Sequence, residues 1–87
     1  MKSYFKIQMK VIEDAVNSLD TAMFNQLLEE CEAALKSGHK IIVSGLGKNV
    51  PVCEKFVGTM NSLGMNAMFM NTNTAVHGDI GMVKPGD

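Results

Sequence analysis

The segment 40-KIIVSGLGKNVPVCEKFVG-58 decides the fold of this chain. It opens with Ile41-Ile42-Val43, a β-branched run without alternation, which is typical of a parallel strand covered on both faces. A glycine loop follows, and apolar residues then recur at helical spacing, namely Cys53, Phe56, Val57 and Met60. Leu63-Gly64 is predicted to end that helix, because glycine suits the left-handed position after a helix.

A second buried strand is predicted at Ala67-Met68-Phe69-Met70, directly after this helix. Strand, helix and strand in this order form a βαβ unit, whose crossover is almost always right-handed. The fold class predicted from the sequence is therefore α/β with a parallel sheet.

Two amphipathic helices are predicted before the first strand. The first has a narrow apolar seam with spacings of 4, 3, 4 and 3, made by Phe5, Met9, Ile12, Val16 and Leu19. The second has a stripe made by Phe24, Leu27, Leu28, Cys31, Ala34 and Leu35. Asp20 is predicted to cap the start of the second helix and Gly38 to end it. We expect a helical hairpin over residues 1–38 and a βαβ unit with its following loop over residues 39–87.

Composition limits the partners and the compartment. The 87 residues suffice for one small domain at most. The net charge of −1, with both signs mixed, argues against nucleic acid or an anionic membrane surface as the main partner. No apolar run approaches the roughly 18–20 residues of a membrane span, and no signal-peptide core is seen. Cys31 and Cys53 suggest neither a metal site nor a disulfide, so we expect a reducing, cytoplasmic setting and no cofactor.

The glycine loop has the features of an anion site. Gly45 and Gly47 allow a ligand to approach the backbone, and Lys48 adds a positive charge. Asn49 is predicted to cap the following helix, with Pro51 in its first turn, where a missing N–H is tolerated. In a parallel sheet, such a loop lies at the carboxyl end of the strand, where ligands bind. A phosphate site and a plain strand-to-helix turn both fit these residues.

Nucleotide motifs are incomplete in this loop. "GLGKNV" has the first two glycines of G-x-G-x-x-G, but Val50 occupies the third position and no acidic residue follows the second strand. The phosphate-loop motif G-x-x-x-x-G-K-[ST] is absent. A dinucleotide or nucleoside triphosphate site is therefore disfavoured.

A second group of polar residues, "TNTAVHGDIGMV" at positions 72–83, follows the second strand. It is predicted to lie at the same sheet edge as the glycine loop. His77, beside Gly78 and Asp79, fits either a proton shuttle or a side chain that caps a turn. His77 does not predict a metal site, because no second ligand stands at a workable spacing.

Taken together, "IIVSGLGKN" and "AVHGDIGMVKPGD" resemble the front half of a sugar isomerase (SIS) domain of the arabinose-5-phosphate isomerase branch. That branch has approximately G-x-G-K-S in the first loop and A-x-H-G-D-x-G-M-V-x-P-x-D in the later segment. The chain matches the second pattern at Ala75, His77, Gly78, Asp79, Gly81, Met82, Val83, Pro85 and Asp87. The resemblance covers essentially the whole chain.

The resemblance implies a flavodoxin-like three-layer α/β/α sandwich and the interconversion of arabinose 5-phosphate with ribulose 5-phosphate through an enediol. It implies that Lys48 offsets phosphate or enediolate charge and that His77 assists ring opening or proton transfer. It places the sugar phosphate near Ser44, Gly45, Gly47, Lys48, Asn49 and Thr74. It also implies self-association to dimers or tetramers, which the exposed apolar seams independently favour.

The chain departs from this family in two ways. Asn49 stands where the family usually has a serine, and the family's serine-rich loop and glutamate candidates for the catalytic base follow a third strand. From the "MVKPGD" turn we expect a truncated domain whose parent is an isomerase, while the 87 residues alone are inactive. The alternative is a non-catalytic module that binds or senses a sugar phosphate.

Overall fold

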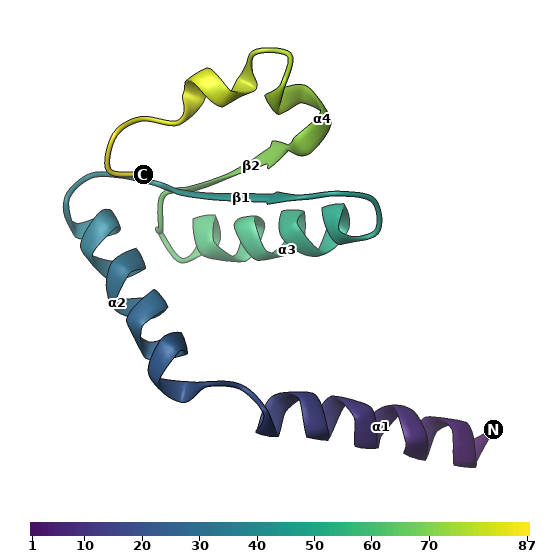
Figure 1. Cartoon of the computed structure of the whole chain (residues 1–87). Helices are drawn as coiled ribbons and strands as arrows, with labels where there is room; N and C mark the ends of the chain where they lie inside the picture. Colours follow the sequence, from purple (N-terminus) through teal and green to yellow (C-terminus); the bar gives the residue numbers. More distant parts are fainter.

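The computed structural model describes all 87 residues and contains seven elements. They are α1 (Lys2–Asn17), α2 (Thr21–Lys36), β1 (Ile41–Gly45), α3 (Asn49–Ser62), β2 (Ala67–Asn71), α4 (Thr72–Ala75) and the 3₁₀ helix η1 (Asp79–Met82) (Figure 1). The predicted order of two helices followed by a βαβ unit is confirmed. The short helices α4 and η1 lie within residues 72–83, for which the sequence predicted polar site residues but no helix.

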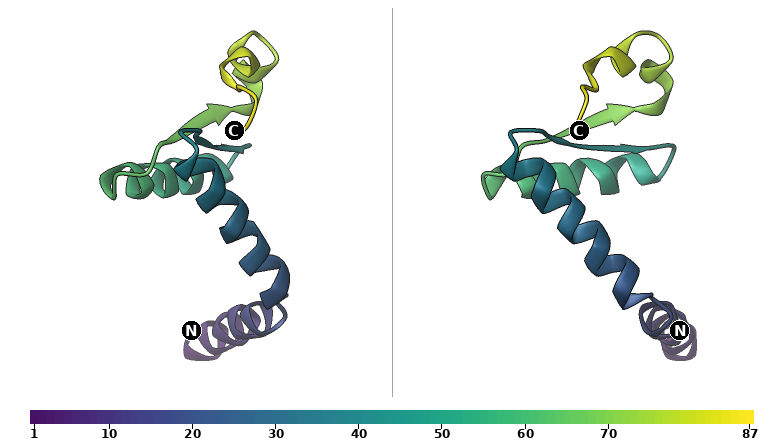
Figure 2. Two further views of the ribbon diagram at one scale, coloured as in Figure 1. Left: turned by 90° about the vertical axis from the view of Figure 1, so that its left-hand side faces the viewer. Right: turned by 60° about the vertical axis from the view of Figure 1, so that its left-hand side comes forward.

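The sheet consists of two parallel strands. Its register runs from Ile41 opposite Ala67 to Gly45 opposite Asn71, so the two strands end together. Helix α3 lies on one side of this sheet, and the segment after β2 loops back on the other side (Figures 1 and 2). The α/β class is thereby confirmed.

Helix ends follow the predicted local chemistry. The Asp20 carboxylate accepts a hydrogen bond from the Met23 N–H at 3.1 Å, so it caps the start of α2. Gly38 and Gly64 both have φ of +83°, the left-handed conformation that glycine adopts without a steric penalty. These three boundaries are confirmed as predicted.

Helices α1 and α2 form, but they do not lie side by side as a hairpin. Helix α1 projects away from α2, and the two axes diverge in every view (Figures 1 and 2). Neither helix has a buried residue, and the seam residue Phe5 is 55% exposed. A periodic apolar seam predicts which side of a helix is buried. The direction of α1 depends instead on residues 18–20, which connect it to α2.

The chain is extended for its size. Its radius of gyration is 16.3 Å, whereas a compact domain of this length has about 12 Å. Only Val57, Ala67 and Ala75 are buried. All three lie in or beside the βαβ unit, so the small core of the chain sits where α3 and α4 meet the sheet. No helix of the structure has both the length and the apolar character needed to cross a membrane.

Candidate functional site

The candidate site lies where β1 and β2 end. Because the strands are parallel and Gly45 pairs with Asn71, the loop that follows β1 and the helix that follows β2 emerge at the same edge of the sheet. This is the position predicted for the ligand.

The hydroxyl of Thr72 joins the two strand ends. It donates a hydrogen bond to the Gly45 carbonyl oxygen at 2.9 Å and lies 3.1 Å from the Ser44 hydroxyl. A threonine has a single hydroxyl proton, so the Ser44 hydroxyl is the donor in the second bond. The Ser44 oxygen consequently keeps its acceptor capacity free and exposed. Ser44 and Thr72 are thus held relative to each other by side-chain hydrogen bonds as well as by the pairing of β1 with β2.

Gly45 allows α3 to approach the end of β1. A methyl group at this position would lie 2.8 Å from the Cys53 Sγ and 3.3 Å from the Asn49 Cβ. The Cys53 thiol also donates to the Ser44 carbonyl oxygen at 3.6 Å. The first turn of α3 is therefore held against the strand through a position that only glycine fills without displacement.

The loop between β1 and α3 winds directly into the helix. The Asn49 N–H donates to the Leu46 carbonyl oxygen at 3.2 Å, and the Val50 N–H donates to the Gly47 carbonyl oxygen at 3.1 Å. Asn49 is consequently the first helical residue of α3, and Lys48 is the N-cap without a side-chain capping bond. The prediction that Asn49 caps the helix is wrong by one position, because these tight turns start the helix earlier.

Two backbone donors and one ammonium group are left free in this loop. No hydrogen bond uses the N–H of Gly47 or of Lys48, and the Lys48 ammonium is in no ion pair. Gly47 has φ of +61° while Lys48 is right-handed, an alternation that turns successive N–H groups toward one side. Pro51 occupies the first turn of α3, as predicted, and lacks an N–H.

The segment after β2 is stabilised by its own short-range bonds. The Asn71 carboxamide oxygen accepts the Asn73 N–H at 2.8 Å, and the Thr74 hydroxyl donates to the Asn71 carbonyl oxygen at 3.1 Å. The His77 N–H donates to the Thr74 carbonyl oxygen at 3.0 Å, and His77 is exposed. No hydrogen bond or ion pair involves its imidazole, so the imidazole nitrogens are free for a ligand.

The structure brings only some of the predicted site residues into contact. Ser44 and Gly45 are joined through Thr72, whereas no hydrogen bond or ion pair connects Lys48 with His77. None of the hollows of the molecule is lined by these residues. No group of three His, Cys, Asp or Glu side chains could hold a metal ion. The edge is therefore an open surface.

Sequence reasoning missed a carboxylate clamp at the opposite end of the sheet. The Asp87 carboxylate accepts the Lys40 N–H at 3.1 Å, the Lys40 ammonium at 2.6 Å and the Lys84 N–H at 2.9 Å. The side-chain hydrogen bond from Lys40 and the backbone bond from Lys84 lower the pKa of Asp87 from 3.8 to about 2. The clamp thus closes the segment that carries His77 into a loop anchored at both ends of the sheet.

No protein-family model matches this chain, and no solved structure matches it. Curated relatives do match, and they identify the chain as a region related to phosphosugar isomerases. In particular, the chain is related to the arabinose 5-phosphate isomerases named KdsD, which confirms the resemblance seen in the sequence.

The KdsD of Pseudomonas aeruginosa is 34% identical over 74 residues, which are 85% of this chain and 23% of that protein. The KdsD of Yersinia pestis is 30% identical over 79 residues, or 91% of this chain and 24% of that protein. The KdsD of Francisella tularensis is 29% identical over 86 residues, or 95% of this chain and 25% of that protein. The chain spans about a quarter of the length of these relatives.

Proposed function

We propose that the edge formed by the ends of β1 and β2 binds the phosphate group of a sugar phosphate, as part of an SIS-type aldose–ketose isomerase. The observation that carries this proposal is the loop from Leu46 to Lys48. It combines two free N–H groups, a free ammonium and a glycine-lined approach at the carboxyl end of a parallel strand. Hydrogen bonds between such donors and phosphate oxygens are charge-assisted and therefore strong.

The substrate pair proposed is arabinose 5-phosphate and ribulose 5-phosphate, because the matched relatives are named arabinose 5-phosphate isomerases. In this proposal Lys48 holds the phosphate or offsets enediolate charge, and His77 moves a proton during ring opening or enediol formation. Ser44 has an acceptor oxygen for a sugar hydroxyl, since its own proton is used by Thr72. Gly45, Gly47, Asn49 and Thr74 complete the proposed substrate-binding set.

The assembly proposed for the whole protein is a flavodoxin-like α/β/α domain that self-associates to dimers or tetramers. The exposed apolar residues of α1 and α2 support self-association, because soluble monomers seldom expose such large apolar surfaces. A non-catalytic sugar-phosphate sensor remains the alternative function. The free N–H groups and the free ammonium of the loop from Leu46 to Lys48 would serve such a sensor equally well.

A binding experiment tests the proposal on the chain as it is. Arabinose 5-phosphate is titrated onto ¹⁵N-labelled chain while the amide signals of Gly47 and Lys48 are followed. Lys48→Gln is expected to weaken binding about 10- to 100-fold, because a hydrogen bond to a charged group contributes about 1.5–3 kcal/mol. Lys55→Gln is the matched control: it makes the same charge change at an exposed position further along α3.

Unphosphorylated arabinose is the ligand control. It is expected to leave the Gly47 and Lys48 amide signals unchanged at concentrations at which arabinose 5-phosphate saturates them. Equal weakening by Lys48→Gln and Lys55→Gln would contradict the proposal, since it would show only a general charge effect. Formation of ribulose 5-phosphate by the bound chain would favour the isomerase over the sensor.

A further inference from the structure

Donors and acceptors are separated at the ends of the two strands. The free N–H groups of Gly47 and Lys48 and the Lys48 ammonium are all donors, and they lie in the loop after β1. The Ser44 hydroxyl gives its proton to the Thr72 oxygen at 3.1 Å, because the Thr72 proton is used by the Gly45 carbonyl oxygen at 2.9 Å. Ser44 therefore offers a ligand an acceptor and no donor.

The Ser44 hydroxyl and helix α3 lie on opposite faces of the sheet. A methyl group on Gly45 would point toward α3, where it would lie 2.8 Å from the Cys53 Sγ. Successive side chains of a strand point to opposite faces, so the side chain of Ser44 points away from α3. The segment that begins with Thr72 lies on that other side of the sheet (Figures 1 and 2). The acceptor is thus on the face that carries the segment with His77.

Reversing the two hydroxyl bonds would cost the strand end a hydrogen bond. Two hydroxyl oxygens 3.1 Å apart need one proton between them, so Ser44 could donate to a phosphate oxygen only if the Thr72 proton turned to Ser44. The Gly45 carbonyl oxygen would then lose its bond to Thr72. A ligand hydroxyl that donates to Ser44 adds a hydrogen bond without removing one. The pair of hydroxyl groups therefore favours a ligand hydroxyl over a second anionic group.

We propose that Thr72 is a positioning residue that sets the specificity of this edge. By holding the Ser44 proton, it selects phosphate monoesters that carry a hydroxyl group and disfavours bisphosphates and inorganic phosphate. The phosphate lies at Gly47 and Lys48, and the sugar extends over the face that carries the segment with His77. This inference rests on the proposed function, since it requires the loop after β1 to bind the phosphate.

The test compares two phosphate monoesters on the ¹⁵N-labelled chain. Arabinose 5-phosphate has hydroxyl groups and methyl phosphate has none. The dissociation constant of methyl phosphate divided by that of arabinose 5-phosphate therefore measures the preference for a hydroxyl. Thr72→Val is expected to lower this ratio about 3- to 10-fold, chiefly by weakening arabinose 5-phosphate, which is the effect of one typical hydrogen bond. Thr72→Ser retains the hydroxyl and is expected to retain the preference.

The ratio separates positioning from structural damage. Partial unfolding of a variant lowers both affinities by the same factor and leaves the ratio unchanged. Thr59→Val makes the same substitution near the far end of α3 and is expected to have no effect on the ratio. Ser44→Ala removes the acceptor itself and is expected to lower the ratio as much as Thr72→Val, with no further loss when the two are combined. Ser44→Ala also tests the inference if Thr72→Val does not fold.

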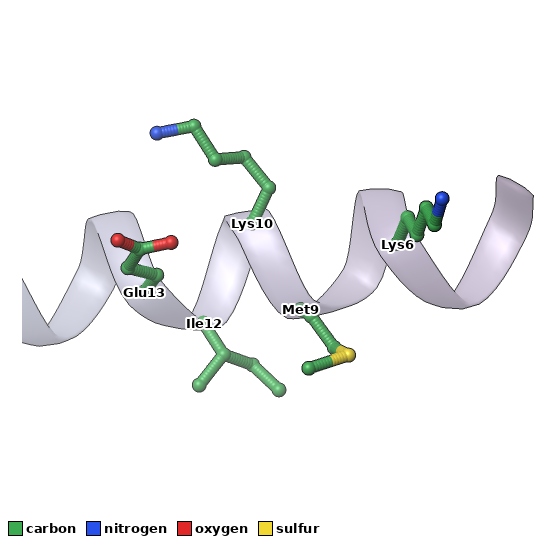
Figure 3. Close-up of a pocket in the computed structure, with 5 residues that line it drawn as sticks. All are labelled: Lys6, Met9, Lys10, Ile12 and Glu13. Carbon is green, nitrogen blue, oxygen red and sulfur yellow. The ribbon is translucent and has the colours of Figure 1, made fainter.

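Lysines on α1 provide a control for general attraction of phosphate. Lys6 and Lys10 line a hollow on that helix together with Glu13 (Figure 3). The Lys10 ammonium is already paired with the Asp14 carboxylate at 2.7 Å. The amide signals of these residues are expected to stay in place while those of Gly47 and Lys48 shift. Equal shifts on α1 would show non-specific binding and would overturn both the inference and the proposed function.

The remaining outcomes distinguish the two proposals. An unchanged ratio in Thr72→Val or in Ser44→Ala would overturn this inference alone, provided that the unmodified chain binds arabinose 5-phosphate and Lys48→Gln weakens that binding. A ratio in Thr72→Ser as low as that in Thr72→Val would also overturn it, since the hydroxyl would then not be the cause. If the unmodified chain does not bind arabinose 5-phosphate, or if Lys48→Gln has no effect, the proposed function fails and this inference fails with it.

Discussion

Helices α1 and α3 are of similar length, yet they differ in burial. Both carry apolar residues at helical spacing, but Val57 of α3 is 7% exposed, whereas α1 has no buried residue. The difference lies in what each helix meets: α3 is returned onto β1 and β2 by the two connections of the βαβ unit, and α1 has one short connection that directs it outward. Amphipathic periodicity therefore predicts which side of a helix is suited to burial, and the topology of the chain determines which element, if any, covers that side.

The largest expected effect tests this difference directly. Val57→Ala is expected to lower the free energy of unfolding by about 2–3 kcal/mol, because it removes buried methyl groups and leaves a cavity. Val11→Ala removes the same groups at a position that is 57% exposed and off the seam, and should change stability by less than about 0.5 kcal/mol. Helix propensity changes equally in both variants. Urea unfolding measures both, and equal losses would show that α1 is packed as well as α3.

Two glycines provide the next comparison, one at the end of β1, where it faces α3, and one within α3 itself. Gly45→Ala is expected to destabilise the chain by about 1–2 kcal/mol, since the added methyl group would lie 2.8 Å from the Cys53 Sγ. Gly58→Ala, within α3 and with no atom near the added methyl group, is expected to stabilise by about 0.5–1 kcal/mol.

Adding Cys53→Ala to Gly45→Ala should recover most of the loss, because it removes the atom that clashes. Thermal unfolding of the single and double variants provides the measurement. An additive double variant would show that the close contact between β1 and α3 is unimportant.

A smaller effect is expected from the hydroxyl that joins the strand ends. Thr72→Val removes two hydrogen bonds, those with Ser44 and with the Gly45 carbonyl, and is expected to cost about 1 kcal/mol. Thr74→Val removes a single local bond to the Asn71 carbonyl oxygen and serves as the control, with an expected loss of about 0.5 kcal/mol. If Thr74→Val proved the more costly change in urea unfolding, the connection between the strand ends would not matter.

The comparison also shows what the sequence can and cannot predict. Asp20, Gly38 and Gly64 were predicted at their positions because caps and left-handed turns depend on chemistry within a few residues. The two strands were predicted because an apolar β-branched run needs no distant information. The direction of α1 was not predictable, since the seam is the same whether its partner lies in the chain or outside it.

The candidate site was likewise predictable only in part. Its location at the strand ends follows from the order of the elements, and the register of β1 against β2 agrees with it. The role of Thr72 was missed because its partner Gly45 lies 27 residues away. Asn49 was misplaced by one residue, since the turns that start α3 depend on hydrogen bonds of Leu46 and Gly47 that the cap rule does not include. Contacts made at a distance in sequence leave no local pattern.

The hydrogen bond between the Lys40 ammonium and the Asp87 carboxylate joins residues that are 47 positions apart, and the pH dependence of its contribution to stability should be confined to low pH. The folded state lowers its pKa from 3.8 to about 2, so the ionised carboxylate is favoured on folding. The contribution is therefore complete above about pH 4 and is lost as the pH falls toward about 2. The His39 Nδ1 also faces the Asp87 carboxylate, at 3.9 Å.

The Lys40 amide signal reports this contact, because its N–H donates to the Asp87 carboxylate. In the unmodified chain the signal should titrate with a midpoint near pH 2, and in Asp87→Asn it should not titrate with that midpoint. Asp79→Asn is the control, since Asp79 is in no ion pair. A midpoint near the ordinary 3.8 would mean that Lys40 and Lys84 do not hold the carboxylate in solution. The segment that carries His77 would then be anchored at β2 alone, and its position over the sheet would depend on the short-range bonds of α4.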